Sequence, residues 1–271
     1  MGRPENVMQV FSLLDKSNCR KCGEKSCLAF AGAVFLGRRP ITDCPSIDHE
    51  RAGRFLEPGS GNIPAEEQDV YFKELIERVT RSDLRQAAER TGGRFDGVKL
   101  SVKILGKDFS VDTSGNLFSD IHIIPWIAVP FLVYVLESKG QQVSGEWLSF
   151  RELDGGKERY PLFQKRCEEG MKRIADVYTE LFDDMTQLFQ ARKVENRFDS
   201  DISVILPVLP LVPLMICYWK ADEGIGSSLN IFFDRSIDAN LGAESAFTIG
   251  AGLTQMFEKL TLRHGCAIEQ T

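Results

Sequence analysis

The sequence has little of what marks a secreted, membrane-spanning or nucleic-acid-binding protein. Its N-terminal stretch lacks the apolar core and the small-residue cleavage site of a secretory signal. The two longest apolar stretches, 121–136 and 202–219, are broken by prolines, whereas a membrane-spanning helix needs about 20 apolar residues with intact hydrogen bonding. The formal net charge of −6 argues against a nucleic-acid binder, which usually carries a basic face. We therefore predict a cytoplasmic location, no membrane span and no nucleic-acid partner.

The common local signatures of catalysis are also missing. There is no GxxxxGK[ST] phosphate loop, no GxGxxG after a strand, no GxSxG and no HExxH. Asp222, Glu223 and Asp234 flank the ends of predicted strands, where paired carboxylates can perform acid–base chemistry. Such residues are more often turn and surface residues, which is the role we expect for them. The sequence names no substrate, and it leaves open whether the protein is an enzyme.

The chain of 271 residues is long enough for one or two domains with buried cores. The pattern predicts an α+β fold, in which a small cysteine-rich helical module over 1–57 is followed by a mixed α+β domain over 68–271. A turn-rich linker, 58–66, separates them. Ser26 is a good N-terminal cap for a helix that starts at Cys27 and stops near Gly37.

Periodicity predicts the remaining elements. Helices are expected over 8–14, 70–90, 124–139, 160–193 and 243–263. Strands or hairpins are expected over 98–105, 108–118, 202–205, 214–219 and 229–233, and 145–153 is a short segment followed by a Gly-Gly turn.

Four of the seven cysteines lie close together in the pattern Cys19-x2-Cys22-x4-Cys27-x16-Cys44-Pro45. Thiolate sulfur is a preferred ligand of iron in clusters, and a cubane needs four thiolates at its corners. The close spacing lets one loop wrap three corners, and Cys44 closes the site. We therefore predict a 4Fe–4S cluster as the cofactor, bound through these four cysteines.

The charges near the cysteines agree with an anionic cluster. Cys27 lies at the start of a predicted helix, where the N–H groups favour negative charge. Six basic side chains surround the motif, with Glu24 as the single acid between 16 and 39: Lys16, Arg20, Lys21, Lys25, Arg38 and Arg39. A basic surface there suits an acidic partner protein.

Three other states compete for these four cysteines: a structural zinc site, disulfides and unliganded thiols. A structural zinc also uses Cys-x2-Cys pairs, although zinc sites usually contain two such pairs and Cys44 stands alone. Disulfides are disfavoured by the expected compartment. Of the other cysteines, Cys217 is expected to be a packed core thiol. A second metal site from Cys167, Cys266 and His264 has no supporting spacing. His49 is expected at the surface, and His122 in the core.

The segment LLDKSNCRKCGEKSCLAFAGAVFLGRRPITDCP resembles the small iron–sulfur module of the corrinoid iron–sulfur protein large subunit and of the B subunit of a bacterial electron-transport complex. The resemblance covers about residues 8–47, and the matching positions are Asn18, Cys19, Cys22, Gly23, Cys27, Ala29, Gly37, Cys44 and Pro45. It implies a 4Fe–4S cluster on the four cysteines and a redox partner from corrinoid-linked or anaerobic metabolism.

The larger part resembles domain of unknown function 3786. The matching segments are GEWLSFREL (145–153), LPVLPLVPL (206–214) and NIFFDRSI (230–237), together with Tyr160, Phe163 and Trp219. This family has no assigned activity, so the resemblance implies no catalytic residues. The leading hypothesis is one-electron transfer to or from a partner protein. The alternatives are a cluster-dependent enzyme whose C-terminal domain binds a small molecule, and an interaction module with a structural zinc.

Overall fold

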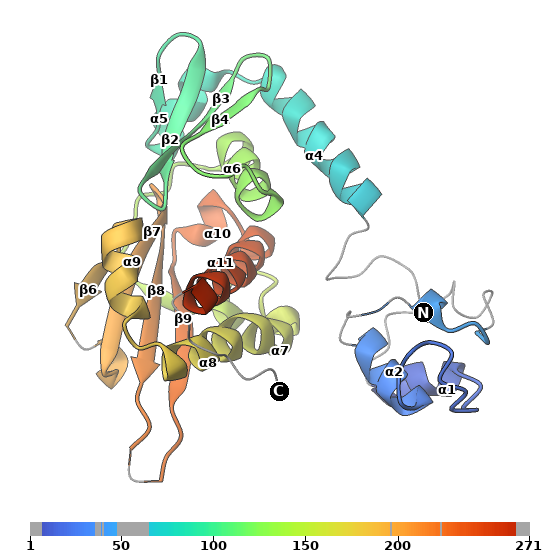
Figure 1. Cartoon of the computed structure of the whole chain (residues 1–271). Coiled ribbons are helices and arrows are strands. Elements are labelled where there is room, and N and C mark those ends of the chain that lie inside the picture. Colours follow the sequence, from blue (N-terminus) through green and yellow to red (C-terminus); the bar gives the residue numbers. More distant parts are fainter. Residues whose placement is uncertain are drawn as a thin grey trace. The chain divides into compact units, whose positions relative to one another are not determined.

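The computed structural model describes residues 7–35, 39, 41–47, 65–195, 197–222 and 224–263. The chain divides into two compact units, residues 1–71 and 72–271, each described here by itself (Figure 1). Both antiparallel sheets lie in the second unit, and the N-terminal unit contains short helices. The fold is α+β, as the sequence predicts. No helix among the described residues is both long and apolar enough to cross a membrane.

The first unit contains the helices α1 (Val7–Leu13) and α2 (Cys27–Phe35), which pack against each other, and a single 3-10 turn, η1 (Ile41–Asp43). The hydroxyl oxygen of Ser26 accepts a hydrogen bond from the N–H of Ala29 at 3.1 Å, which confirms the predicted cap. The predicted stop at Gly37 and most of the predicted linker lie outside the described residues. The core of this unit is small: Val10, Leu14, Cys27, Phe30, Ala31, Ile41, Cys44 and Ile47.

The second unit begins within α4 (Ala65–Thr80) and continues with α5 (Leu84–Thr91). The predicted single helix over 70–90 is therefore two helices. The break follows from Asp83, whose carboxylate accepts hydrogen bonds from the N–H groups of Arg85 and Gln86 and so starts a new helix. Four antiparallel strands form the first sheet: β1 (Arg94–Phe95), β2 (Lys99–Ile104), β3 (Lys107–Asp112) and β4 (Leu117–Ser119).

The second sheet has the strand order β5-β9-β8-β7-β6, and every pair is antiparallel. Its strands are β5 (Trp147–Ser149), β6 (Arg192–Val194), β7 (Ile202–Leu209), β8 (Val212–Trp219) and β9 (Ser228–Asp234). β7 and β8 are longer than the sequence predicts, because Pro207 and Pro213 face each other across the hairpin at a register shift and do not end the strands. The turn falls at Pro210 and Leu211.

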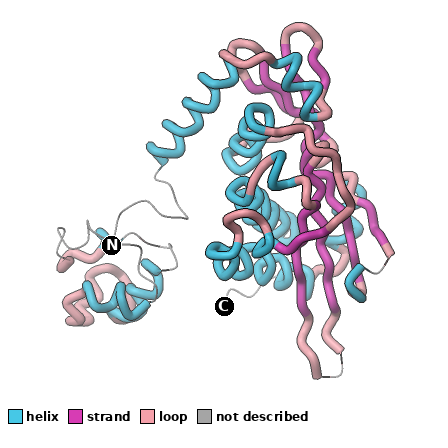
Figure 2. The backbone as a smooth tube through the Cα atoms, turned by 180° about the vertical axis from the view of Figure 1, so that it is seen from behind, coloured by secondary structure: helices cyan, strands magenta, loops and turns pink. Residues whose placement is uncertain are grey.

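Helices gather on one side of this sheet (Figure 2). They are α6 (Pro125–Glu137), α7 (Tyr160–Phe163), α8 (Glu169–Val177), α9 (Leu181–Phe189), α10 (Ile237–Asn240) and α11 (Ala243–Arg263). Side chains alternate along β7, so that Val204 and Leu206 join the main core while Ile205 faces the other side with Met215 and Cys217. Cys217 is fully buried there, which confirms its predicted role as a packed thiol.

The predicted long helix over 160–193 is wrong. A one-turn π-helix, η4 (Gln164–Glu168), interrupts it between α7 and α8, and the chain breaks again at Tyr178. Gln190 then takes a left-handed conformation (φ 55°) that ends α9 and leads into β6. The periodicity survives the breaks because α8 and α9 both bury one apolar face in the same core.

Glu168, the last residue of the π-turn, accepts a hydrogen bond from a backbone N–H of β9 that β5 does not reach. β5 pairs only with residues 232–234 of that strand. At the next position the N–H of Ile231 donates to the Glu168 carboxylate at 3.1 Å, and the hydroxyl of Tyr160 donates to its other oxygen at 3.2 Å. Burial raises the pKa of Glu168, although these donors favour the ionised form.

We expect Glu168→Gln to stabilise the second unit at pH 8 and to change its stability little at pH 4. A carboxyl whose pKa is raised by folding adds stability below its unfolded pKa, about 4.3, and that contribution is lost as the pH rises through the folded value. Glutamine does not ionise, and its side-chain oxygen can still accept from Ile231. Urea unfolding followed by tryptophan fluorescence measures this, because all three tryptophans lie in the second unit.

The matched control is the neighbouring Glu169→Gln, since Glu169 is exposed. It should give the same stability as the native chain at both pH values. A Glu168→Gln gain that is equal at pH 4 and pH 8, or larger at pH 4, would contradict the argument.

Candidate metal centre

The four cysteines of the motif come from three local structures of the first unit. Cys19 and Cys22 lie in the loop between α1 and α2, Cys27 is the first residue of α2, and Cys44 directly follows η1. Cys27 and Cys44 belong to the small core, with exposed fractions of 6% and 4%. Cys22 is half-buried and packs against this core, and Cys19 is exposed. The structure thus places two thiols inside the unit and two in the loop at its surface.

The loop before α2 is tightly curled. Four of its residues have left-handed backbone conformations: Lys16, Asn18, Arg20 and Gly23, with φ between 50° and 83°. Only glycine adopts this region without steric cost, so Gly23 suits its position while the other three are held there by contacts. The N–H of Gly23 donates to the carbonyl of Arg20 at 3.0 Å, and the Arg39 guanidinium donates to the carbonyl of Cys22.

Asn18 fastens this loop to the start of α2 with two reciprocal hydrogen bonds. Its side-chain oxygen accepts from the N–H of Cys27 at 2.8 Å, and its own N–H donates to the Cys27 sulfur at 3.3 Å. An N–H directed at sulfur stabilises negative charge on that sulfur, and the start of a helix adds to the effect. Asn18 thus joins the curled loop to the first residue of α2 and directs one backbone N–H at the Cys27 sulfur.

The surroundings act differently on the two ends of the motif. The N–H of Lys21 and the hydroxyl of Ser17 lower the pKa of Cys19. Burial raises the pKa of Cys44, and negative charge on Asp15, Cys22 and Cys19 raises it further, against the N–H of Ser46.

This donor set fits an iron–sulfur cluster. Its four cysteines lie in one short segment of the first unit, backbone N–H groups are directed at Cys19, Cys27 and Cys44, and thiolates are the ligands that such clusters prefer. Over the described ranges, no three His, Cys, Asp or Glu side chains are grouped so as to hold a single metal ion.

The remaining candidates lie elsewhere or have other roles. Cys167 is fully buried in the second unit, and Cys217 contacts the hydroxyl of Ser203 at 3.6 Å. His122 is exposed, so the prediction that it lies in the core is wrong. His122 lies in the loop between β4 and α6. His49, Glu223, His264 and Cys266 lie outside the described residues.

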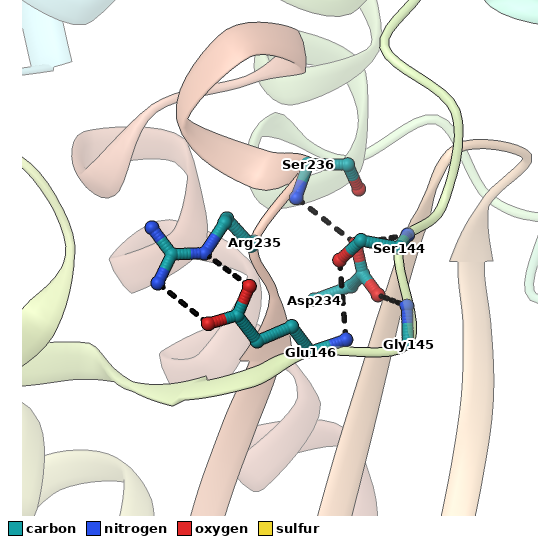
Figure 3. A network of polar contacts seen from close by, with 6 residues as sticks. All are labelled: Ser144, Gly145, Glu146, Asp234, Arg235 and Ser236. Carbon is teal, nitrogen blue, oxygen red and sulfur yellow. Dashed lines mark hydrogen bonds and ion pairs between the residues drawn. The ribbon is translucent and has the colours of Figure 1, made fainter.

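Asp234 differs most from its prediction. It was expected to be a turn or surface residue, yet it is fully buried. Its carboxylate accepts from the N–H groups of Ser144, Gly145 and Ser236 at 3.0, 2.6 and 2.9 Å and from the Ser144 hydroxyl at 3.1 Å (Figure 3). Beside it Arg235 and Glu146 form a two-bond ion pair that is half-exposed. Asp234 thus fastens the loop before β5 to the end of β9. Its expected role as a turn or surface residue is wrong, because the carboxylate is buried among these donors.

One open cleft of about 530 Å³ lies in the second unit. Its walls come from the two sheets and the end of α9, and its polar side chains include Arg94, Lys103, Asp108 and Gln190. Lys103 and Asp108 pair with each other at 2.9 Å.

Sequence reasoning found the four cysteines but only part of the machinery around them. Asn18 was noticed through the resemblance, without a physical role. Asp15 and Ser17 were missed, although Asp-x-Ser is a local signal: the Asp15 carboxylate accepts from both the N–H and the hydroxyl of Ser17.

Comparison with protein families gives two matches. The model described as "Domain of unknown function (DUF3786)" matches residues 83–256, and the model described as "Putative Fe-S cluster" matches residues 14–46. The second match contains all four cysteines of the motif.

Curated relatives match the N-terminal part. The acetyl-CoA decarbonylase/synthase complex subunit gamma of Methanocaldococcus jannaschii is 38% identical over 48 residues, which is 18% of this chain and 10% of the relative. The subunit of the same name from Methanothermobacter thermautotrophicus is 36% identical over 70 residues, 24% of this chain and 15% of the relative. The chain therefore spans only a small part of these relatives. No solved structure matches the chain.

Proposed function

The chain belongs to the DUF3786 family, and from that starting point we propose that its first unit binds one 4Fe–4S cluster through Cys19, Cys22, Cys27 and Cys44. The observation that carries the proposal is that Cys27 and Cys44 are buried in one small core, against which Cys22 packs, while Cys19 lies on the curled loop of the same unit. Buried thiolates are costly unless they are paired with positive charge, and cluster iron supplies that charge.

The function that follows is one-electron transfer to or from a partner protein. When bound, such a cluster accepts and donates single electrons at a potential set by hydrogen bonds to sulfur and by solvent exposure. The chain's own residues set both: the Asn18 N–H lies on the Cys27 sulfur, and the small apolar core shields Cys44. The similarity to subunits of an acetyl-CoA decarbonylase/synthase complex supports a partner in corrinoid-linked, anaerobic metabolism. We propose with it that residues 1–57 form the cluster-binding module and residues 68–271 form a separate α+β domain.

Two alternatives differ in what they require. A cluster-dependent enzyme would need a small molecule in the second unit, and the cleft lined by Arg94 and Lys103 is the place for it. A structural zinc would leave the same four thiols bound but inactive in redox chemistry.

Anaerobic reconstitution with iron and sulfide tests the proposal. We expect about four irons per chain and a paramagnetic signal that appears only after reduction with dithionite, as for a redox-active cubane. The electron paramagnetic resonance spectrum before and after reduction, together with metal and sulfide analysis, gives the answer. Zinc at one per chain and no signal would move the protein to the structural-metal class and end the electron-transfer proposal.

A further inference from the structure

The four cysteines differ in how closely another protein can approach them. Cys27 and Cys44 are almost fully enclosed, Cys22 is half-buried, and Cys19 is exposed. Electron transfer between proteins becomes much slower as the distance between the redox centres grows. A partner that exchanges electrons with this site therefore gains most by docking over Cys19.

The surface around Cys19 is basic. Lys16, Arg20, Lys21 and Lys25 are exposed on the same curled loop, and none of them forms an ion pair with another residue that the structure describes. The acids of the loop are fewer. Asp15 is exposed, with its carboxylate hydrogen-bonded to Ser17, and Glu24 is half-buried.

The loop has little freedom to rearrange. Its left-handed residues and the Asn18–Cys27 hydrogen bonds fix the path of the backbone between Lys16 and Cys27. The four basic side chains are therefore presented from a fixed frame around the exposed thiol. Next to them Leu28, on the first turn of α2, is 48% exposed and adds an apolar contact at the rim.

We propose that this loop, residues 16–25, is the docking surface for an acidic redox protein that exchanges electrons at the Cys19 corner; this rests on the proposed function. One electron leaves the partner and reaches the chain at this corner, or passes the other way, and no covalent bond forms or breaks. The cations supply orientation and a fast, salt-dependent encounter. The protein as a whole is acidic, with a net charge of −6, so the basic loop also directs an acidic partner away from the rest of the surface.

The test uses the full chain with its cluster reconstituted and an acidic plant-type ferredoxin as the probe. Two quantities are measured: the equilibrium affinity for the oxidised, fluorescently labelled probe, and the stopped-flow rate of electron transfer from the reduced probe. We expect both to fall as salt is raised from 20 to about 300 mM. The double variant Arg20→Glu/Lys21→Glu should lower the affinity at low salt about tenfold or more and remove most of the salt dependence.

The control makes the same change of net charge in the second unit. Lys157→Glu/Lys165→Glu reverses two exposed lysines that form no ion pair with described residues, and it should bind the probe nearly as the native chain does. Equal losses in the two double variants would overturn the proposal. So would an affinity independent of salt, or binding of the native chain to vesicles of anionic lipid with none to the ferredoxin.

Iron, sulfide and the reduced paramagnetic spectrum are measured on every variant before the binding experiment. A failure of the proposed function shows at that stage, as a native chain that takes up no cluster. A failure of the docking inference shows later, as fully loaded variants that still bind the probe normally.

Discussion

Cys44→Ser is expected to abolish stable cluster binding and, with it, the folded state of the first unit. Cys44 is 4% exposed and lies in a core of only eight buried residues between Val10 and Ile47. Domains below about 40 residues usually need a metal or disulfides to fold, because they bury too little apolar surface. The buried core of this unit is small in the same way, because its eight described members all lie within residues 10–47. Cluster binding and folding should therefore be coupled.

The readouts are iron content and hydrogen exchange. In Cys44→Ser we expect iron to fall well below the four per chain of the reconstituted native protein, and the amides of α1 and α2 to exchange as in an unfolded chain. The second unit, which has its own core, should keep its unfolding transition by tryptophan fluorescence. Removing iron from the native chain with a chelator should have the same two effects.

Cys217→Ser provides the control. Cys217 is also a fully buried thiol, but it lies on the second sheet beside Ser203. It should keep the full iron and sulfide content. A Cys44→Ser protein that kept its iron, its sulfide and an unchanged spectrum would leave the proposed ligand set one short, and the cluster assignment would fall.

Asp234→Ala is expected to destabilise the second unit by roughly 3–5 kcal/mol. It removes a fully buried carboxylate and leaves three N–H groups, those of Ser144, Gly145 and Ser236, without their acceptor. An unsatisfied donor that is buried, as the N–H of Ser236 is, costs about 1–3 kcal/mol, and a donor that met a charge costs more. The measurement is urea unfolding followed by tryptophan fluorescence, in which Trp147 on β5 lies close to the change.

Its control lies next to it in Figure 3. The Arg235–Glu146 pair is more than half exposed, so solvent screens it and Glu146→Gln should cost little stability. A cost for Asp234→Ala no greater than that of Glu146→Gln would show that the network does not hold the loop.

The stability that Asp234 contributes should be lost at low pH. Burial opposes ionisation of Asp234, but the N–H groups of Ser144, Ser236 and Gly145 outweigh it and lower the pKa. A lowered pKa contributes stability above the unfolded value, about 3.9, that is lost as the pH falls through the folded value. The difference between native and Asp234→Ala should therefore shrink below pH 4 and stay constant above it.

Local signals predicted the elements that local contacts determine. The bounds of α11 and the start of α2 were confirmed because an apolar period and the Ser26 cap lie within the segments themselves. The break at Asp83 and the π-turn at Gln164–Glu168 were missed. In both cases the helical period continues across the break, so the pattern gives no sign of it.

Contacts between segments far apart in the chain could not be predicted from the sequence. Asp234 reads as a turn residue because the loop that covers it, Ser144–Gly145, lies 90 residues earlier in the chain. In the metal centre, spacing and resemblance identified the cysteines. The burial of Cys27 and Cys44 against the exposure of Cys19 depends on how α1 packs on α2, and only the structure gives it.

The pairing of β5 with β9 has a consequence for the order in which the protein is made. Its two partners, Trp147–Ser149 and residues 232–234, are separated by more than 80 residues, so a ribosome must finish most of the second unit before this sheet can close. Until then β5 has no strand to pair with. The cysteine loop and α2 are complete by Cys44, long before that point. All four proposed ligands of the cluster are therefore made while the larger unit is still unfinished.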